Sequence, residues 1–259
     1  MRASLIQIGV DPDEPVNSRR DRAASFVRDQ SGADLVVLPE LWTVGAFAFD
    51  RFEAEAEPVR TGPTAEVMAQ AAGDARVWLH AGSIVERAPD GALYNTSLVF
   101  SPDGELARTY RKIHRFGFDR GEVTLMSAGD EPVTVSLPAL TVGLATCYDL
   151  RFPELFRALT DAGSQLLVIP AGWPDQRAAH WTLLARARAV ENQCYVLACG
   201  TAGTHAGVPQ AGRSAIIDPW GEMLAEAPDA TEQVITAEFD PAQVAKVRED
   251  FPALKDRVL

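Results

Sequence analysis

The sequence predicts an α/β protein in which two β-sheets pack face to face, with helices on their outer faces. Three observations support this prediction. Short runs of β-branched and aliphatic residues alternate with longer segments of helical period. Gly, Pro and Asp bound both kinds of segment. Hairpin turns lie among the strand–helix units, which is typical of two packed mixed sheets.

The expected strands each hold a short run of β-branched, aliphatic or aromatic side chains. In chain order they are Ser4–Val10, Asp34–Leu38, Val77–Val85, Ala92–Phe100, Leu106–Tyr110, Val133–Leu137, Leu140–Cys147, Gln165–Ile169, Cys194–Cys199, Gly212–Ile217 and Gln233–Glu238. Two turns are especially clear, because Asp90-Gly91 and Pro102-Asp103-Gly104 carry residues that tight turns favour. These turns predict hairpins within the first half of the chain.

The expected helices show apolar residues at spacings of three and four. They are Glu14–Gln30, Thr64–Gly73, Pro153–Ala162, Gln176–Asn192 and Pro241–Phe251. The fourth has the clearest pattern, and we expect one apolar face made of Trp181, Leu184, Ala185, Ala189 and Val190. That face predicts a helix that packs against a sheet.

The chain has 259 residues, of which 47% are hydrophobic and 23% charged, so a sizeable folded core is expected. The sequence shows no internal repeat, no low-complexity tract and no linker of Pro, Gly or Ser. We therefore expect one domain over residues 1–259.

The charge balance argues against several classes of partner. Asp and Glu number 36 against 24 Lys and Arg, which gives a net charge of −12. Proteins that bind nucleic acid or anionic lipid need clustered cationic side chains. No stretch reaches the ~20 apolar residues of a membrane span, and the N-terminus lacks the apolar region of a secretory signal. We expect a cytoplasmic protein without a nucleic-acid or membrane partner.

The cysteine pattern also favours a reducing compartment. The three cysteines, Cys147, Cys194 and Cys199, are too few and too oddly numbered for a disulfide framework. No Cys/His cluster has zinc spacing, so no metal site is predicted. Cys194 and Cys199 lie in an apolar strand and are interpreted as core residues.

Two candidate catalytic residues lie where apolar strands end, the usual location of active sites in α/β proteins. Glu40 follows Leu35–Leu38 and is flanked by Pro, Leu and Trp, so partial burial would suit it to act as a general base. A surface glutamate at a strand exit is the alternative. Lys112 follows Leu106–Tyr110 and offers a positive charge for a developing oxyanion. A solvated basic cluster is the alternative for Lys112.

Cys147 is the third candidate and lies between a strand and a predicted helix that begins near Pro153. Such a turn is expected to expose the sulfur, and its backbone N–H groups can lower the pKa of a thiol. A buried core cysteine is the alternative. None of the four histidines belongs to a cysteine-protease signature, so Glu and Lys are the natural assistants of a thiol nucleophile.

These residues lie in motifs that resemble the nitrilase superfamily of carbon–nitrogen hydrolases. The matching motifs are Leu38-Pro39-Glu40, Tyr110-Arg111-Lys112-Ile113-His114 and Thr146-Cys147-Tyr148-Asp149-Leu150-Arg151-Phe152-Pro153-Glu154-Leu155. They occur in the family order and at family-like separations. The resemblance extends from Leu5 to about Phe239.

The resemblance implies a four-layer α-β-β-α sandwich of the nitrilase type and a Glu-Lys-Cys triad. Cys147 would be the nucleophile, Glu40 the general base and Lys112 the stabiliser of the tetrahedral intermediate. The Tyr148 backbone N–H would complete the oxyanion site, and Glu122 matches a second family glutamate, with an ordinary loop carboxylate as its alternative. A homodimer is a family expectation, and the chemistry requires no cofactor.

The resemblance also implies a substrate class. The segment around Cys147 looks most like the amidases of the ω-amidase and deaminated-glutathione amidase group, which release ammonia from small carboxylated amides through a thioester. N-carbamoyl amino-acid hydrolysis and acyl transfer from the same thioester are the alternatives. Arg151 is a candidate for the substrate carboxylate, with an ion pair to Asp149 or Glu154 as its alternative. Trp173 resembles a family pocket residue but would equally suit the core.

Overall fold

The computed structural model describes residues 1–258, and two six-stranded sheets form its centre. The first sheet has the order β14-β1-β2-β3-β4-β5 and consists of β1 (Arg2–Gln7), β2 (Leu35–Val37), β3 (Trp78–Arg87), β4 (Leu93–Phe100), β5 (Leu106–Arg111) and β14 (Gln233–Glu238). The second has the order β13-β12-β9-β8-β7-β6 and consists of β6 (Val133–Ser136), β7 (Thr141–Leu144), β8 (Leu166–Ala171), β9 (Tyr195–Gly200), β12 (Ala215–Ile217) and β13 (Met223–Glu226). A short hairpin is formed by β10 (Thr204–His205) and β11 (Val208–Pro209).

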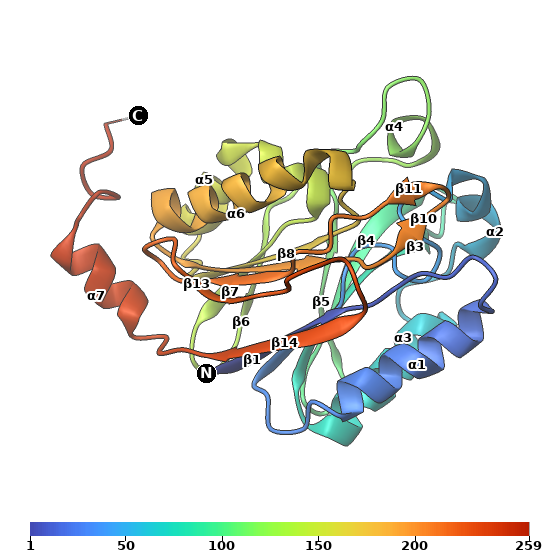
Figure 1. The fold of residues 1–259 in the computed structure, drawn as a ribbon, viewed down its shortest axis with the longest axis horizontal. Helices are drawn as coiled ribbons and strands as arrows, with labels where there is room; N and C mark the ends of the chain where they lie inside the picture. Colours follow the sequence, from blue (N-terminus) through green and yellow to red (C-terminus); the bar gives the residue numbers. More distant parts are fainter. Residues whose placement is uncertain (259) are drawn as a thin grey trace.

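Helices cover the outer face of each sheet (Figure 1). One layer contains α1 (Val16–Arg28) and α3 (Pro63–Ala75), and the opposite layer contains α5 (Pro153–Asp161) and α6 (Ala178–Asn192). The remaining helical elements are short: η1 (Phe49–Arg51), α2 (Phe52–Glu55), α4 (Glu122–Leu125), η2 (Cys147–Arg151), η3 (Asp175–Arg177) and α7 (Gln243–Asp250). The predicted α-β-β-α sandwich is confirmed. Within residues 1–258, no helix is long and apolar enough to cross a membrane.

The alternation of side chains along the strands explains the layers. Successive residues of a strand point to opposite faces, so one strand can serve two cores. In β1, Leu5 packs in the core between the sheets and Ile6 in the core beneath α1 and α3. In β8, Val168 packs between the sheets and Leu167 beneath α5 and α6. Both faces are apolar, which accounts for the continuous hydrophobic runs in these strands.

The predicted apolar face of α6 needs one correction. Trp181, Ala185 and Ala189 are buried as expected, but the Val190 side chain is 51% exposed and Arg188 is buried instead. Val190 lies nine positions after Trp181, which is about two and a half turns and therefore the opposite side of the helix. Arg188 is buried because its guanidinium donates to the Leu150 carbonyl, at 2.8 Å from Nη2.

The parallel strands determine where the site forms. In the first sheet β2 is parallel to β1 and β3, and in the second β8 is parallel to β7 and β9. Ligand sites in such sheets lie beyond the carboxyl ends of the strands. The segments that follow β2, β7 and β8 therefore can meet across the two sheets.

Candidate active site

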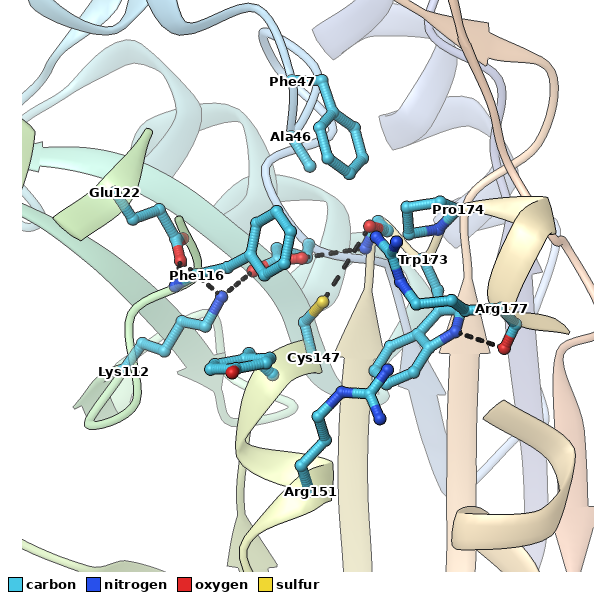
Figure 2. A pocket seen from close by; sticks show the side chains of 13 residues that line it. Ala46, Phe47, Lys112, Phe116, Glu122, Cys147, Arg151, Trp173, Pro174 and Arg177 are labelled. Atoms are coloured by element: carbon cyan, nitrogen blue, oxygen red, sulfur yellow. Dashed lines mark hydrogen bonds and ion pairs between the residues drawn. The ribbon is translucent and has the colours of Figure 1, made fainter. Parts of the chain in front are cut away.

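Four sequence-predicted residues meet at one point between the two sheets. Glu40 follows β2, Lys112 directly follows β5, Glu122 begins α4 and Cys147 begins η2. The exposed fraction is 1% for Glu40, 2% for Lys112 and Glu122, and 7% for Cys147. Figure 2 shows Lys112 and Glu122 on one side of the Cys147 thiol. The surface alternative for Glu40 and the solvated-cluster alternative for Lys112 are thus wrong, and Glu122 is buried with them.

Lys112 forms ion pairs with both carboxylates. Its Nζ lies 2.8 Å from Glu40 Oε1 and 2.7 Å from Glu122 Oε2. Burial alone would lower the pKa of Lys112, but the charges of Glu122 and Glu40 outweigh it and hold that pKa well above its ordinary value. Burial raises the pKa of Glu122, and the Lys112 charge opposes this rise. The cluster therefore keeps Lys112 positively charged although its side chain is buried.

Asn95, in β4, links the same two carboxylates. Its Nδ2 donates to Glu40 Oε1 at 2.8 Å and to Glu122 Oε1 at 2.6 Å. The Asn95 backbone carbonyl also accepts a hydrogen bond from the Lys112 backbone N–H at 2.8 Å. Sequence reasoning missed Asn95, because the residue pattern of a strand does not show that an asparagine side chain will be buried next to charged residues.

The position of Glu40 depends on a close approach of backbones. Gly82 in β3 has φ +65°, and a Cβ at this residue would lie 1.9 Å from the Pro39 carbonyl oxygen. Glycine is therefore required where β3 passes the Pro39–Glu40 segment. Beyond Glu40, Leu41 also adopts a positive φ of 45°, and its backbone N–H donates to the Ser83 hydroxyl at 3.1 Å.

Cys147 differs from the sequence prediction in two respects. The thiol is buried, and its pKa lies well above the ordinary value because burial and the nearby Glu40 charge both disfavour the thiolate, while Lys112 opposes them. The predicted exposure of the sulfur and the predicted lowering of its pKa are therefore wrong. Cys147 does lie in a sharp turn, with φ +48°, an unusual conformation for a side chain other than glycine. A buried thiol next to a carboxylate needs that carboxylate to remove its proton.

The turn that holds Cys147 is fixed by Asp149. The Asp149 carboxylate is fully buried and accepts hydrogen bonds from the Thr146 backbone N–H at 2.8 Å and the Tyr110 hydroxyl at 2.7 Å. It also accepts the His114 backbone N–H at 3.0 Å. Asp149 thus ties the nucleophile turn to the segment that carries Lys112, and it is not the ion-pair partner of Arg151.

An open pocket leads from the surface to the thiol and contains about 390 Å³ of empty space. Aromatic and cationic side chains line it around Cys147, namely Phe47, Phe116, Tyr148, Arg151, Trp173 and Arg177. Figure 2 places Trp173, Arg151 and Arg177 together on the side of the pocket opposite Lys112. Trp173 is therefore both a buried residue and a pocket residue.

The two arginines of the pocket have no carboxylate partner within residues 1–258. The Arg151 guanidinium lies 4.8 Å from the centre of the Trp173 ring, and its nearest polar neighbour is the His180 ring at 3.4 Å. The Arg177 guanidinium lies 5.6 Å from the centre of the Phe116 ring. Both cations are thus available to an anionic group of a bound molecule. Sequence reasoning missed Arg177, whose only signal was its place shortly after Trp173.

The other two cysteines are core residues, as predicted. Cys194 and Cys199 are fully buried, and burial raises the pKa of Cys194 to about 12 and that of Cys199 further. Neither lines the pocket. The part of the chain that the structure describes contains no group of three or more His, Cys, Asp or Glu side chains arranged to hold a metal ion.

The sequence profile of the carbon–nitrogen hydrolases matches residues 3–249. The chain belongs to this family. It is 42% identical to the 2-oxoglutaramate amidase of Paenarthrobacter nicotinovorans, over 98% of this chain and 88% of that protein. It is 37% identical to the human omega-amidase NIT2, over 99% of this chain and 94% of that protein.

Solved structures agree with this assignment. Saccharomyces cerevisiae Nit3, a member of the nitrilase superfamily, superposes with a TM-score of 0.90 at 31% identity, over 100% of this chain and 97% of that one. XC1258 of Xanthomonas campestris, which carries an arsenic adduct in its active site, gives a TM-score of 0.91 at 32% identity, over 100% and 97%. The carbon–nitrogen hydrolase described here is a cysteine-dependent amidase that acts on non-peptide C–N bonds of small-molecule amides.

Proposed function

We propose that this hydrolase is an ω-amidase that hydrolyses the amide of a short 2-oxo acid amide of the 2-oxoglutaramate type to a carboxylic acid and ammonia. The observation that carries the proposal is the pair of arginines, Arg151 and Arg177, that lie opposite Lys112 and have no carboxylate partner among residues 1–258. An amide at Cys147 would place a carboxylate at its other end within reach of these guanidiniums, which bind carboxylates in a bidentate manner. The relatives named as 2-oxoglutaramate amidases and omega-amidases support this substrate class.

In the proposed reaction, Glu40 removes the Cys147 thiol proton and the thiolate attacks the amide carbon. The oxygen of the tetrahedral intermediate gains negative charge, which Lys112 Nζ and the Tyr148 backbone N–H stabilise. The Tyr148 N–H lies in the first turn of η2, where helical N–H groups have no internal partner. Glu40 returns the proton to the amide nitrogen, the C–N bond breaks and ammonia leaves.

The second half of the reaction uses the same residues. The acyl group is now a thioester on Cys147, and Glu40 takes a proton from water so that the hydroxide attacks the thioester carbon. The C–S bond breaks, the carboxylic acid is released and the thiol regains its proton. Glu122 holds Lys112 in place throughout, through the ion pair at 2.7 Å. No step draws on a cofactor.

The alternative reactions make different products. N-carbamoyl amino-acid hydrolysis would release carbon dioxide with ammonia, and acyl transfer would leave the acyl group on an added amine. The amidase relatives favour simple hydrolysis. An assay that follows ammonia, carbon dioxide and hydroxamate with 2-oxoglutaramate, deaminated glutathione and an N-carbamoyl amino acid separates these reactions.

The experiment that tests the substrate class compares Arg177→Ala and Arg151→Ala with the unmodified protein. Loss of one guanidinium should raise KM for 2-oxoglutaramate by about tenfold or more, since a hydrogen bond to a charged group contributes about 1.5–3 kcal/mol. The KM for an uncharged amide of similar length should not change. If both substrates respond equally, or neither responds, the pocket does not recognise the carboxylate.

We further propose that residues 1–259 form one catalytic domain.

We also propose that two copies of the chain assemble into a dimer through the outer face of α6. Leu183 and Val190 support this assembly, because they are 67% and 51% exposed on that face. Light scattering should give a dimer mass, and Leu183→Glu should give a monomer. The three unpaired cysteines support a cytoplasmic location.

A further inference from the structure

The geometry points to Asn95 as a positioning residue that holds Glu40 and Glu122 in their working arrangement. This inference rests on the proposed roles of Glu40 and Cys147. Asn95 does not line the pocket, so it acts through the carboxylates and not through the substrate.

The first argument is the set of contacts that Asn95 makes. Its side chain is 3% exposed, and both carboxylates accept from Nδ2, at 2.8 Å for Glu40 and 2.6 Å for Glu122. The two protons of an amide group are enough for these two hydrogen bonds. The backbone carbonyl of Asn95 meanwhile accepts the Lys112 N–H. One residue therefore contacts all three charged residues of the cluster.

The second argument is the orientation of the amide. If the Asn95 amide were flipped, its Oδ1 would face two carboxylates and be repelled by them. The NH₂ group must therefore point toward Glu40 and Glu122. In this orientation Oδ1 is buried and has no hydrogen-bond partner within residues 1–258. An unpaired buried carbonyl is unfavourable, and a leucine of similar size would avoid it. Asparagine at this position is thus explained by the two hydrogen bonds that its NH₂ group donates.

The third argument is that the two carboxylate oxygens of Glu40 have different hydrogen-bond donors. Oε1 accepts hydrogen bonds from both Lys112 Nζ and Asn95 Nδ2. Among residues 1–258, the donor to Oε2 is the Gly172 N–H, at 2.8 Å, and the Gly172 carbonyl oxygen lies 3.9 Å from Cys147 Sγ. Holding Oε1 therefore leaves Oε2, on the Gly172 side of the carboxylate, as the oxygen that takes the thiol proton.

The fourth argument is electrostatic. Two carboxylates share one ammonium in a buried site, and the negative charge of Glu40 adds to the burial that raises the pKa of Glu122. The charged and titratable groups that face them are Lys112 after β5 and Cys147 in η2, with Arg151 and Arg177 farther along the pocket. Donation by Asn95 stabilises the ionised form of both carboxylates. Without it, both carboxylates lose a donor that faces their negative charge, and Glu40 is less firmly held beside the nucleophile.

The experiment compares Asn95→Leu and Asn95→Asp with the unmodified protein and with Thr96→Val as a matched control. Thr96 neighbours Asn95 on β4 and donates its hydroxyl to the buried Glu86 carboxylate at 2.5 Å, outside the active site. All variants are measured for kcat and KM on the best amide across pH, and for the rate at which iodoacetamide alkylates Cys147. The alkylation rate does not depend on any assumed substrate.

We expect both Asn95 variants to lower kcat by about tenfold or more and leave KM nearly unchanged, because only the carboxylates are disturbed. The acid limb of the kcat/KM profile should move to higher pH by about one unit, and the pH dependence of the Cys147 alkylation rate should shift in the same direction. Thr96→Val should move neither. An unchanged pH profile in folded Asn95 variants, or a change confined to KM, would overturn the inference.

Two further measurements separate the possible failures. If Glu40→Gln keeps full activity, the proposed role of Glu40 is wrong, whereas loss in Glu40→Gln with no effect at Asn95 overturns only this inference. If the Asn95 variants do not fold, the unmodified protein with ¹⁵N-labelled asparagine provides the test. The Asn95 side-chain NH₂ resonances should shift across the acid limb of activity, and resonances that stay constant there would overturn the inference.

Discussion

The backbone N–H of Gly172 donates a hydrogen bond of 2.8 Å to the carboxylate of Glu40. Glu40 follows β2 in the first sheet and Gly172 follows β8 in the second, 132 positions later in the chain. The general-base candidate of one sheet is thus anchored by the backbone of the other. Since Gly172 also neighbours the Cys147 thiol, the packing of the two sheets brings base and nucleophile together.

Selective alkylation should distinguish Cys147 from the two core thiols. All three thiols are buried, and burial raises the pKa of each, but only Cys147 lines the pocket and has a carboxylate beside it. Peptide mapping after brief iodoacetamide treatment should find the label on Cys147. Equal and slow labelling of Cys147, Cys194 and Cys199 would contradict a nucleophilic role.

Glu122→Gln should change the basic side of the activity profile. Glu122 is one of the two negative charges that hold the pKa of Lys112 high against its burial. With a neutral amide in its place, Lys112 should lose its proton at lower pH, so the basic limb of kcat/KM should move down. We expect kcat to fall by about a hundredfold. A basic limb at the same pH in both proteins would show that Lys112 does not depend on Glu122.

Gly82→Ala should disturb Glu40 from a distance. The added Cβ would meet the Pro39 carbonyl oxygen at 1.9 Å, and alanine is strained at φ +65°. We expect a loss of about 1–3 kcal/mol in the free energy of unfolding together with a lower kcat. Gly91→Ala is the matched control, because Gly91 also has a positive φ, of 86°, but no atom lies within 4 Å of its added Cβ. Equal effects on kcat in both variants would contradict the account.

Stability should fall as the pH drops from about 6.5 toward 4, because two histidines are buried uncharged. Burial lowers the pKa of His80 and of His205 from 6.5 to about 4. The unfolded chain binds protons at these residues in that range while the folded protein does not, so acid favours unfolding. Each histidine contributes up to about 3 kcal/mol to the loss. Urea unfolding at pH 7 and pH 5 measures the free energy of unfolding at each pH. His205→Gln should reduce the difference between the two values.

The sequence indicated the layers and three residues of the site for a local reason, whereas Glu122 was indicated only by the family resemblance. Glu40, Lys112 and Cys147 each follow an apolar strand, and strand ends converge in this fold. The exposure of Cys147 was predicted wrongly because burial depends on Gly172 and Trp173, which come from a different part of the chain. Asn95 and Arg177 were missed for the same reason, since only the packed sheets show which groups they face.

The most direct test of the central claim is mass spectrometry of the protein quenched in acid during turnover of 2-oxoglutaramate. The account predicts an acyl adduct on the peptide that contains Cys147, formed with release of ammonia and absent from Cys147→Ala, which should also lose all measurable amidase activity. Continued ammonia release by Cys147→Ala, or turnover by the unmodified protein with no acyl group on Cys147 at any quench time, would contradict it.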